Sequence, residues 1–166
     1  MNITIAGAGL VGARAAHDLC FRGNEVTVVD LDENALRQVR AASDLMTYAG
    51  DAAIPSVLTE AGVAKADLVL ALTGNAEANL VICTIAKAMG VPKTVARLRT
   101  GKSFDADLKL TPATFGVDDY IVPEEDCVAA IMDALRRPAV KECVPIGHRA
   151  CEIVNFLVLP ASPLDG

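Results

Sequence analysis

Three glycines near the start of the chain have the spacing of a phosphate-binding turn. Gly7, Gly9 and Gly12 follow the apolar run at 2–6 and open a segment with helical periodicity. In such a turn the first glycine permits a tight bend, the second lets the backbone approach a pyrophosphate, and the third lets the helix pack closely on the strand. The helix N-terminus adds amide donors and the positive end of the helix dipole. The contacts expected here are Gly7, Ala8, Gly9, Leu10, Val11 and Gly12.

A carboxylate stands where the ribose of such a ligand is usually bound. Asp30 ends the apolar run at 25–29, about 18 residues beyond Gly12. At this place a carboxylate accepts hydrogen bonds from the ribose hydroxyls and repels a 2′-phosphate, so we expect NAD(H), ATP or ADP rather than NADP(H). The alternative is a strand-end carboxylate that caps the next helix, a role for which Asp32 is better placed.

The ends of later strands supply further candidate contacts. Asp51 follows the third apolar run and could face the adenine; a helix N-cap is an equally good interpretation, and the two roles are compatible. Thr73 opens a loop that could line the far side of the nucleotide, although a capping segment would have the same sequence. Arg97 and Arg99 fall on one face of the fifth run and could bind phosphate, or form a surface pair with carboxylates. The contacts expected on this side are Leu31, Asp51, Ala52, Thr73, Gly74, Asn75 and Arg97.

Catalytic groups are missing from the sequence pattern. No nucleophile has a base beside it, no set of residues has metal-ligand spacing, and no second substrate domain follows. His17 and His148 are not placed for hydride transfer, and the five widely spaced cysteines indicate reduced thiols rather than a disulfide or metal site. We therefore expect no catalytic residues and no metal, which favours sensing over catalysis.

The elements that must position these residues alternate along the chain. Short aliphatic runs and helical segments of this kind predict an α/β fold, a Rossmann-like doubly wound parallel sheet of about six strands with right-handed crossovers. We expect this nucleotide-binding domain over 1–136. Residues 137–166, rich in proline, are expected to form a connector and the start of a C-terminal lobe that continues beyond Gly166. The expected strands are 2–6, 25–29, 45–49, 67–72, 93–97, 119–122 and 151–159, and the expected helices are 10–22, 33–42, 53–62, 76–89, 103–109 and 124–136.

Composition and charge narrow the class of partner. The chain has 166 residues, of which 52% are apolar, and a formal net charge of −6. An acidic protein of this kind is not expected to bind nucleic acid or an anionic membrane surface directly. No apolar stretch reaches the roughly 18–20 residues of a membrane span, and no signal segment precedes the first strand, so we expect a cytoplasmic protein.

Taken together, these motifs resemble the TrkA N-terminal or RCK (KTN) family of regulatory domains in potassium transport systems. The resemblance covers about 1–136, and its segment from 50 to 99 is more specific than the glycine turn. One departure is Ala76, where the family often has an acidic residue. The segments that carry the resemblance are 5–12 (IAGAGLVG), 28–32 (VVDLD), 50–52 (GDA), 57–62 (VLTEAG), 66–73 (ADLVLALT), 77–80 (EANL) and 96–99 (ARLR).

The resemblance implies a non-catalytic subunit that binds NAD(H), ATP or ADP and thereby controls potassium flux through a membrane transporter subunit. It also implies a homo-oligomer, a dimer or larger, attached to the membrane only through its partner. The helix at 124–136 is the candidate interface, with packing on its own sheet as an equal alternative. The remaining alternatives are an NAD-dependent oxidoreductase domain and a regulator of another ion transporter.

Overall fold

A computed structural model describes residues 1–100, 104, 107, 109–136, 140–146 and 151–156 of the chain. The fold divides into two compact units, Met1–Pro123 and Glu124–Gly166. The first unit holds a parallel sheet with its helices, and the second holds most of one helix and a two-stranded hairpin. The boundary expected near residue 136 for the nucleotide-binding domain stays a prediction.

Six parallel strands form the sheet of the first unit, in the order β3-β2-β1-β4-β5-β6. The chain crosses from one half of the sheet to the other between β3 and β4, so the strand order reverses beside β1. Ligands of doubly wound sheets bind at such a point, outside the carboxyl ends of the strands. The predicted fold class is confirmed. The strands are β1 (Asn2–Ala6), β2 (Glu25–Asp30), β3 (Met46–Ala49), β4 (Leu68–Ala71), β5 (Lys93–Arg97) and β6 (Asp119–Ile121).

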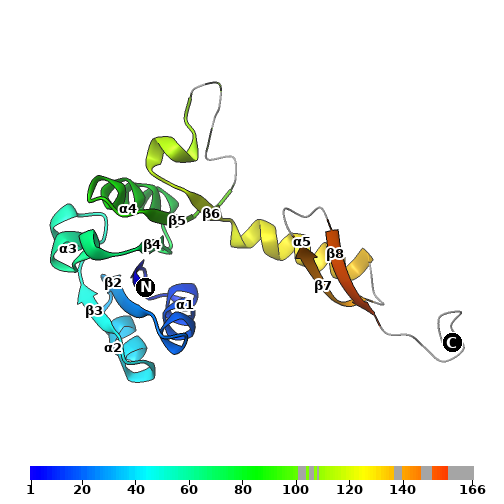
Figure 1. Cartoon of the computed structure of the whole chain (residues 1–166), viewed down its shortest axis with the longest axis horizontal. Coiled ribbons are helices and arrows are strands. Elements are labelled where there is room, and N and C mark those ends of the chain that lie inside the picture. Colours follow the sequence, from blue (N-terminus) through cyan, green and yellow to red (C-terminus); the bar gives the residue numbers. More distant parts are fainter. Residues whose placement is uncertain (101–103, 105–106, 108, 137–139, 147–150, 157–166) are drawn as a thin grey trace, which may run out of the picture. The chain divides into compact units, whose positions relative to one another are not determined.

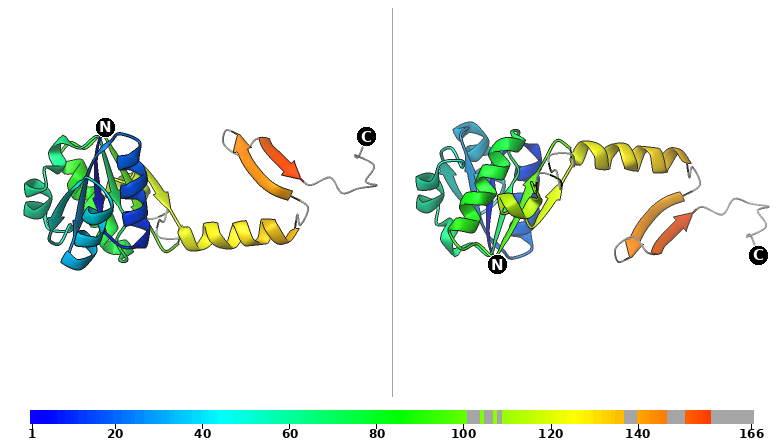
Figure 2. Two further views of the ribbon diagram at one scale, coloured as in Figure 1. Left: turned by 90° about the horizontal axis from the view of Figure 1, so that it is seen from below. Right: turned by 90° about the horizontal axis from the view of Figure 1, so that it is seen from above.

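Helices cover both faces of the sheet (Figures 1 and 2). On one face α1 (Leu10–Phe21) and α2 (Glu33–Ala42) pack on β1 and β2 through a core that includes Ile5, Val28 and Leu36. On the other face α3 (Pro55–Glu60), the 3₁₀ helix η1 (Val63–Lys65) and α4 (Ala76–Ala88) enclose a second core with Leu58 and Ile82. The buried aliphatic runs read in the sequence are these two cores.

The expected helix at 103–109 is wrong at the positions that the structure describes. Phe104, Asp107 and Lys109 are not helical, and the other four positions of that span lie outside the described residues. Lys109 has a left-handed backbone (φ 57°), which ends any right-handed helix. The chain instead forms a 3₁₀ helix, η3 (Pro112–Phe115), and Phe104 packs against Phe115 with ring centroids 6.2 Å apart.

The second unit contains α5 (Pro123–Arg136) from Glu124 onward and an antiparallel hairpin of β7 (Val140–Ile146) and β8 (Cys151–Phe156). The strand expected at 151–159 is β8, whose last three expected residues lie outside the described part of the chain. β7 was not expected, because Pro145 interrupts its sequence. On α5 four apolar residues at helical spacing are exposed by 41% to 70% of their surface and belong to neither core. These are Val128, Ile131, Met132 and Leu135.

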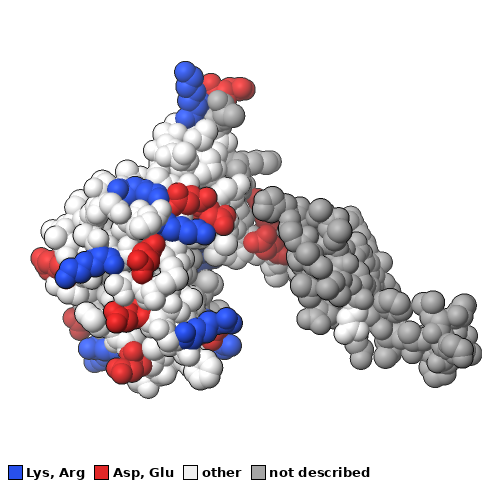
Figure 3. Space-filling view, in the orientation of Figure 1, with Lys and Arg blue, Asp and Glu red and all other residues white. Residues whose placement is uncertain are grey.

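Charged side chains of both signs are interspersed on the face of the first unit seen in Figure 3. That face carries no large patch of a single sign, in keeping with a sequence that is acidic without charge runs. Among the described residues, none of the helices has the length and apolar character needed to cross a bilayer.

Candidate functional site

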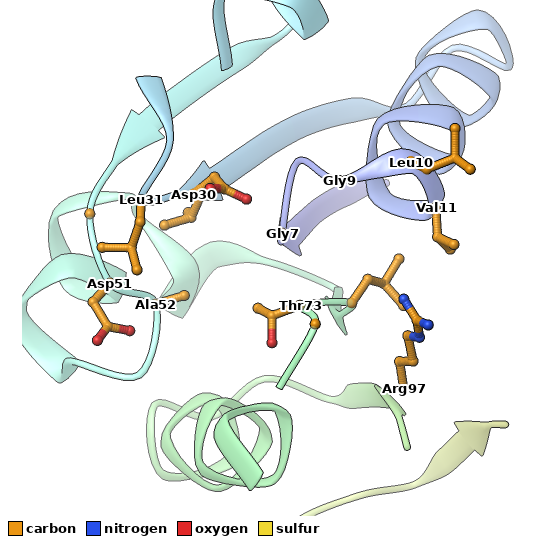
Figure 4. A pocket seen from close by; sticks show the side chains of 14 residues that line it. Gly7, Gly9, Leu10, Val11, Asp30, Leu31, Asp51, Ala52, Thr73 and Arg97 are labelled. Carbon is orange, nitrogen blue, oxygen red and sulfur yellow. The ribbon is translucent and has the colours of Figure 1, made fainter. Parts of the chain in front are cut away.

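A cavity of about 480 Å³ lies outside the carboxyl ends of β1, β2, β4 and β5 (Figure 4). Its volume is in the range of small-molecule sites, which hold ligands in roughly 300–1,000 Å³. The residues that line it come from five segments separated along the chain. They are Gly7, Gly9, Leu10, Val11, Val29, Asp30, Leu31, Gly50, Asp51, Ala52, Leu72, Thr73, Gly74 and Arg97.

The three glycines of the turn between β1 and α1 differ in what a side chain at each position would contact. Gly7 has φ +108°, and a Cβ there would lie 2.9 Å from the backbone of Leu72 and Thr73. A Cβ on Gly12 would overlap the carbonyl oxygen of Gly7. Gly9 is different, because a Cβ there would meet nothing within 4 Å. Gly7 and Gly12 are therefore required by the fold itself, whereas the space in front of Gly9 is open to a ligand.

Asp30 holds the glycine turn against the end of β2. Its carboxylate accepts a hydrogen bond from the backbone N–H of Ala8 at 2.5 Å and another from the N–H of Asp32 at 2.7 Å. A carboxylate can accept about four hydrogen bonds, so it keeps capacity for hydroxyl groups of a ligand. Asp32 is the N-cap of α2 and accepts from the N–H of Asn34 at 2.8 Å. The capping role thus falls to Asp32, as the sequence indicated.

The N-terminus of α1 opens onto the same cavity. Gly9 is its N-cap and supplies no side-chain hydrogen bond, and no acidic residue lies in the first turn. The first amides of this helix therefore have no capping side chain, and the positive end of the helix dipole is not neutralised by its own sequence. This arrangement suits an anionic group of a ligand.

Asp51 lies on the β3 side of the cavity, and the helix N-cap considered for it is wrong, because the N-cap of α3 is Ile54. Its carboxylate accepts from the N–H of Ala53 at 2.9 Å and so stabilises the turn before α3. It also lines the cavity, beside the buried Ala52 and the largely exposed Leu31. Asp51 thus lines the cavity and stabilises a turn that precedes α3, without capping the helix.

Thr73 and Arg97 lie on the opposite side, at the ends of β4 and β5. The Thr73 hydroxyl points toward α4, and its oxygen is 2.6 Å from Oδ1 of Asn79 (Figure 4). Arg97 extends from the end of β5 toward Val11 (Figure 4). Arg99 is exposed and does not line the cavity, so the expected pairing of the two arginines at the site is not seen.

Of the residues expected in the site, Ala8, Gly12 and Asn75 do not line the cavity and the others do. Ala8 contributes its amide to Asp30, Gly12 permits the close packing of α1, and Asn75 caps α4 through the N–H of Ala78 at 2.9 Å. Three further residues line the cavity that were not predicted from the sequence, and all are direct neighbours of expected ones. They are Val29, Gly50 and Leu72.

The cavity offers binding groups rather than reactive ones. Its ionisable side chains are Asp30, Asp51 and Arg97, and none of the lining residues pairs a nucleophile with a base. In the described part of the chain, no three His, Cys, Asp or Glu side chains are grouped to hold a metal ion. The site can therefore bind and orient a polar, partly anionic ligand.

Comparisons with known proteins place this fold in a family. Residues 3–123 match the TrkA-N domain. The Vibrio alginolyticus Trk system potassium uptake protein TrkA is 31% identical over 168 residues, covering 100% of this chain and 37% of that protein. The TrkA homolog of Methanothermobacter thermautotrophicus is 30% identical over 156 residues, covering 94% of this chain and 70% of that protein.

A solved structure, Shewanella denitrificans Kef CTD in its AMP-bound form, superposes with a TM-score of 0.62. It is 22% identical, and the match covers 82% of this chain and 80% of that one, which supports the fold alone. This chain spans only about a third of the length of the Vibrio relative. Because the matched residues make up nearly all of the six-stranded unit, the chain belongs to the TrkA-N domain family.

Proposed function

We propose that this chain is a non-enzymatic regulatory module that binds an adenine nucleotide, NAD(H) or ATP/ADP, and controls a potassium uptake system. The observation that carries the proposal is the composition of one cavity. The cavity brings together a glycine turn, an uncapped helix N-terminus, the Asp30 carboxylate and the Arg97 guanidinium. None of its lining residues forms a pair of a nucleophile and a general base. These groups can hold a nucleotide but offer no evident chemistry on it.

The ligand lies across the carboxyl ends of the strands in this proposal. Its phosphates contact the turn at 7–12 and the first amides of α1, and its ribose hydroxyls donate to Asp30. The adenine lies near Leu31, Asp51 and Ala52. The part of the ligand beyond the phosphates extends toward the loop at 73–75 and Arg97. In this proposal the expected residues that line the cavity contact the ligand, whereas Ala8, Gly12 and Asn75 support the turn and the loop that do so.

Relatives support the regulatory part of the proposal. Two of them are named as potassium uptake proteins of the Trk system, and a structural neighbour was solved with AMP. We infer a cytoplasmic module that reaches the membrane only through a potassium transporter subunit. A nucleotide can shift such an assembly only if it binds one arrangement more tightly than another. The exposed apolar residues of α5 are the proposed contact between copies of the chain.

An oxidoreductase cofactor domain is the rival function, and a regulator of another ion transporter is a third. The rival predicts hydride transfer once the rest of the protein is present, whereas the sensor predicts binding without turnover. The solved Kef structure shares only the fold with this chain, so the two functions have to be distinguished by which ligand binds and whether it is chemically converted.

Calorimetric titration of the purified chain with NADH, NAD, ATP, ADP and NADPH tests the proposal. At least one nucleotide without a 2′-phosphate should bind, NADPH should bind more weakly than NADH, and Asp30→Ala should remove the binding. Asp67→Ala is the matched control. Its carboxylate accepts the N–H of Asn2 at 2.8 Å, at the opposite end of β1 from the cavity. Failure of every nucleotide to bind, or equal losses in the two variants, would contradict the assigned site.

A further inference from the structure

Asn79 is a polar side chain buried behind the cavity. It lies in the first half of α4 and has no exposed surface. Its Oδ1 accepts from the backbone N–H of Thr73 at 3.0 Å and lies 2.6 Å from the Thr73 hydroxyl oxygen. Its Nδ2 donates to the carbonyl of Thr73 at 3.2 Å and to the carbonyl of Arg97 at 2.8 Å. Both donors and both acceptor positions of the carboxamide are therefore used.

These contacts join two strand ends where the sheet no longer does. The ladder between β4 and β5 runs from Leu68 and Lys93 to Ala71 and Ala96. Beyond it, Asn79 links the backbone of Thr73 to that of Arg97, and both residues line the cavity. One buried side chain thus fixes the spacing of the two segments that border this side of the site.

The same contacts remove the Thr73 hydroxyl from the cavity. Its oxygen has Oδ1 of Asn79 at 2.6 Å and the carbonyl of Asn75 at 3.0 Å as acceptors, and it accepts from the N–H of Asn75 at 3.2 Å. The hydroxyl points toward α4 in Figure 4. What this loop offers to a ligand is therefore its backbone, held in place by Asn79, and not the hydroxyl.

We propose that Asn79 is a positioning residue for the part of a dinucleotide that extends beyond the adenosine. The inference rests on the proposed nucleotide function and assigns the two sides of the site to different parts of the ligand. Asp30 and Asp51 border the adenosine side from the ends of β2 and β3, and none of the hydrogen bonds of Asn79 reaches them. Loss of Asn79 should therefore weaken ligands that span both sides and spare ligands confined to the adenosine side.

Asn79→Leu tests this division with two probes, AMP and NADH. Leucine has the same number and branching of side-chain heavy atoms as asparagine and no charge, so it removes the four hydrogen bonds and adds no repulsion of phosphate. The dissociation constant for NADH should rise about tenfold or more, the effect of one or two misplaced hydrogen bonds, while that for AMP changes less than about threefold. A residue that only stabilised α4 would alter both affinities alike or neither, so the ratio of the two is the decisive readout.

Two further variants keep the test interpretable. Thr73→Val leaves Asn79 in place and removes the three hydrogen bonds of the hydroxyl, one to Asn79 and two to the backbone of Asn75. It should weaken NADH binding in the same selective manner, and it provides the test if Asn79→Leu does not fold. Thr84→Val is the control on the same helix, because the Thr84 hydroxyl bonds to the carbonyls of Leu80 and Phe115 at 2.9 Å, away from the cavity. It should leave the ratio unchanged.

The outcomes separate the two proposals. Wild-type protein that binds NADH, together with variants whose affinities for AMP and NADH fall equally or not at all, would overturn the role of Asn79 and leave the nucleotide site standing. Wild-type protein that binds AMP but not NADH would also overturn the role of Asn79, since no ligand would extend past the adenosine. Wild-type protein that binds neither probe would overturn the role of Asn79, and if NAD, ATP and ADP also failed to bind, the proposed function itself would be overturned.

Discussion

Gly9→Ala should separate the requirements of the fold from those of the ligand. Gly9 has φ −65° and ψ −176°, a conformation that any residue adopts. A Cβ there meets nothing within 4 Å. Replacing glycine by alanine at such a position typically stabilises a protein by about 0.4–1 kcal/mol, because the unfolded chain loses freedom. The variant should therefore fold at least as stably as the wild type.

The same methyl group should weaken nucleotide binding. Gly9 lines the cavity, and in the proposed site the ligand's phosphates lie directly against its backbone. A methyl group at the contact moves the phosphates away from the amide donors of the turn. Hydrogen bonds to charged groups contribute about 1.5–3 kcal/mol each, so the loss of one corresponds to roughly ten- to hundredfold in the dissociation constant.

Urea denaturation and calorimetric titration with NADH measure the two effects on the same sample. Gly12→Ala provides the contrast, since its Cβ would overlap the carbonyl oxygen of Gly7. Overpacking of this kind should lower the free energy of unfolding by about 1–3 kcal/mol or more. If Gly9→Ala bound NADH as tightly as the wild type, the placement of the phosphates on this turn would be refuted. If it were destabilised like Gly12→Ala, the open space in front of Gly9 would be refuted.

Three further predictions follow from groups outside the cavity. Burial acts to raise the pKa of Asp118, but hydrogen bonds from Lys87 and the Thr94 amide outweigh it and leave the pKa below its ordinary value. The charged carboxylate therefore stabilises the fold above its unfolded-state pKa of about 3.9, and this stabilisation is lost as the pH falls through the lower folded-state pKa. In Asp118→Asn the free energy of unfolding, measured by urea titration, should therefore fall less steeply between about pH 5 and pH 2. An unchanged dependence of that free energy on pH would contradict this. Burial raises the pKa of the Cys83 thiol to about 12, so iodoacetamide at about pH 8 should label the exposed Cys127 and spare Cys83 in the native protein, as peptide mass spectrometry can check. Asp32→Ala should lower the free energy of unfolding by about 0.5–2 kcal/mol through loss of the α2 cap, and an unaltered urea midpoint would disprove that role.

Features with a short-range cause were predictable from the sequence. The strand at 2–6 and the turn glycines are adjacent in the chain, and the strand that ends at Asp30 follows with the usual spacing. Parallel connections then bring the ends of β1, β2, β4 and β5 to one edge, so most expected contacts line the cavity without any long-range information.

Features that depend on tertiary packing were not predictable in the same way. The bond from Ala8 to Asp30 joins residues 22 positions apart, and the sequence showed only a turn and an acid. Asn79 carried a weaker signal that could have been used. On α4 the buried positions are Ala76, Asn79, Ile82, Cys83 and Ala86, a helical stripe in which the one amide side chain requires buried partners.

Two elements were misjudged because local rules gave the wrong answer. The segment at 103–109 has apolar residues at helical spacing, yet Phe104 packs on Phe115 and Tyr120, and Lys109 takes a left-handed backbone. β7 includes Pro145, a residue that usually excludes a central strand. In a two-stranded hairpin every strand is an edge, so a proline that donates no hydrogen bond can be accommodated there.

The central place of β1 in the sheet has a consequence for synthesis of the protein. β1 is made first, but its two partners appear at very different times: Ile3 pairs with Val26 on one side and with Leu68 on the other. Until β4 has left the ribosome, β1 forms an unpaired, aliphatic edge of the nascent three-stranded sheet, at the position that becomes the middle of the complete sheet. Such edges recruit other strands, so nascent chains that end before residue 68 should need chaperone protection that the completed six-stranded unit does not.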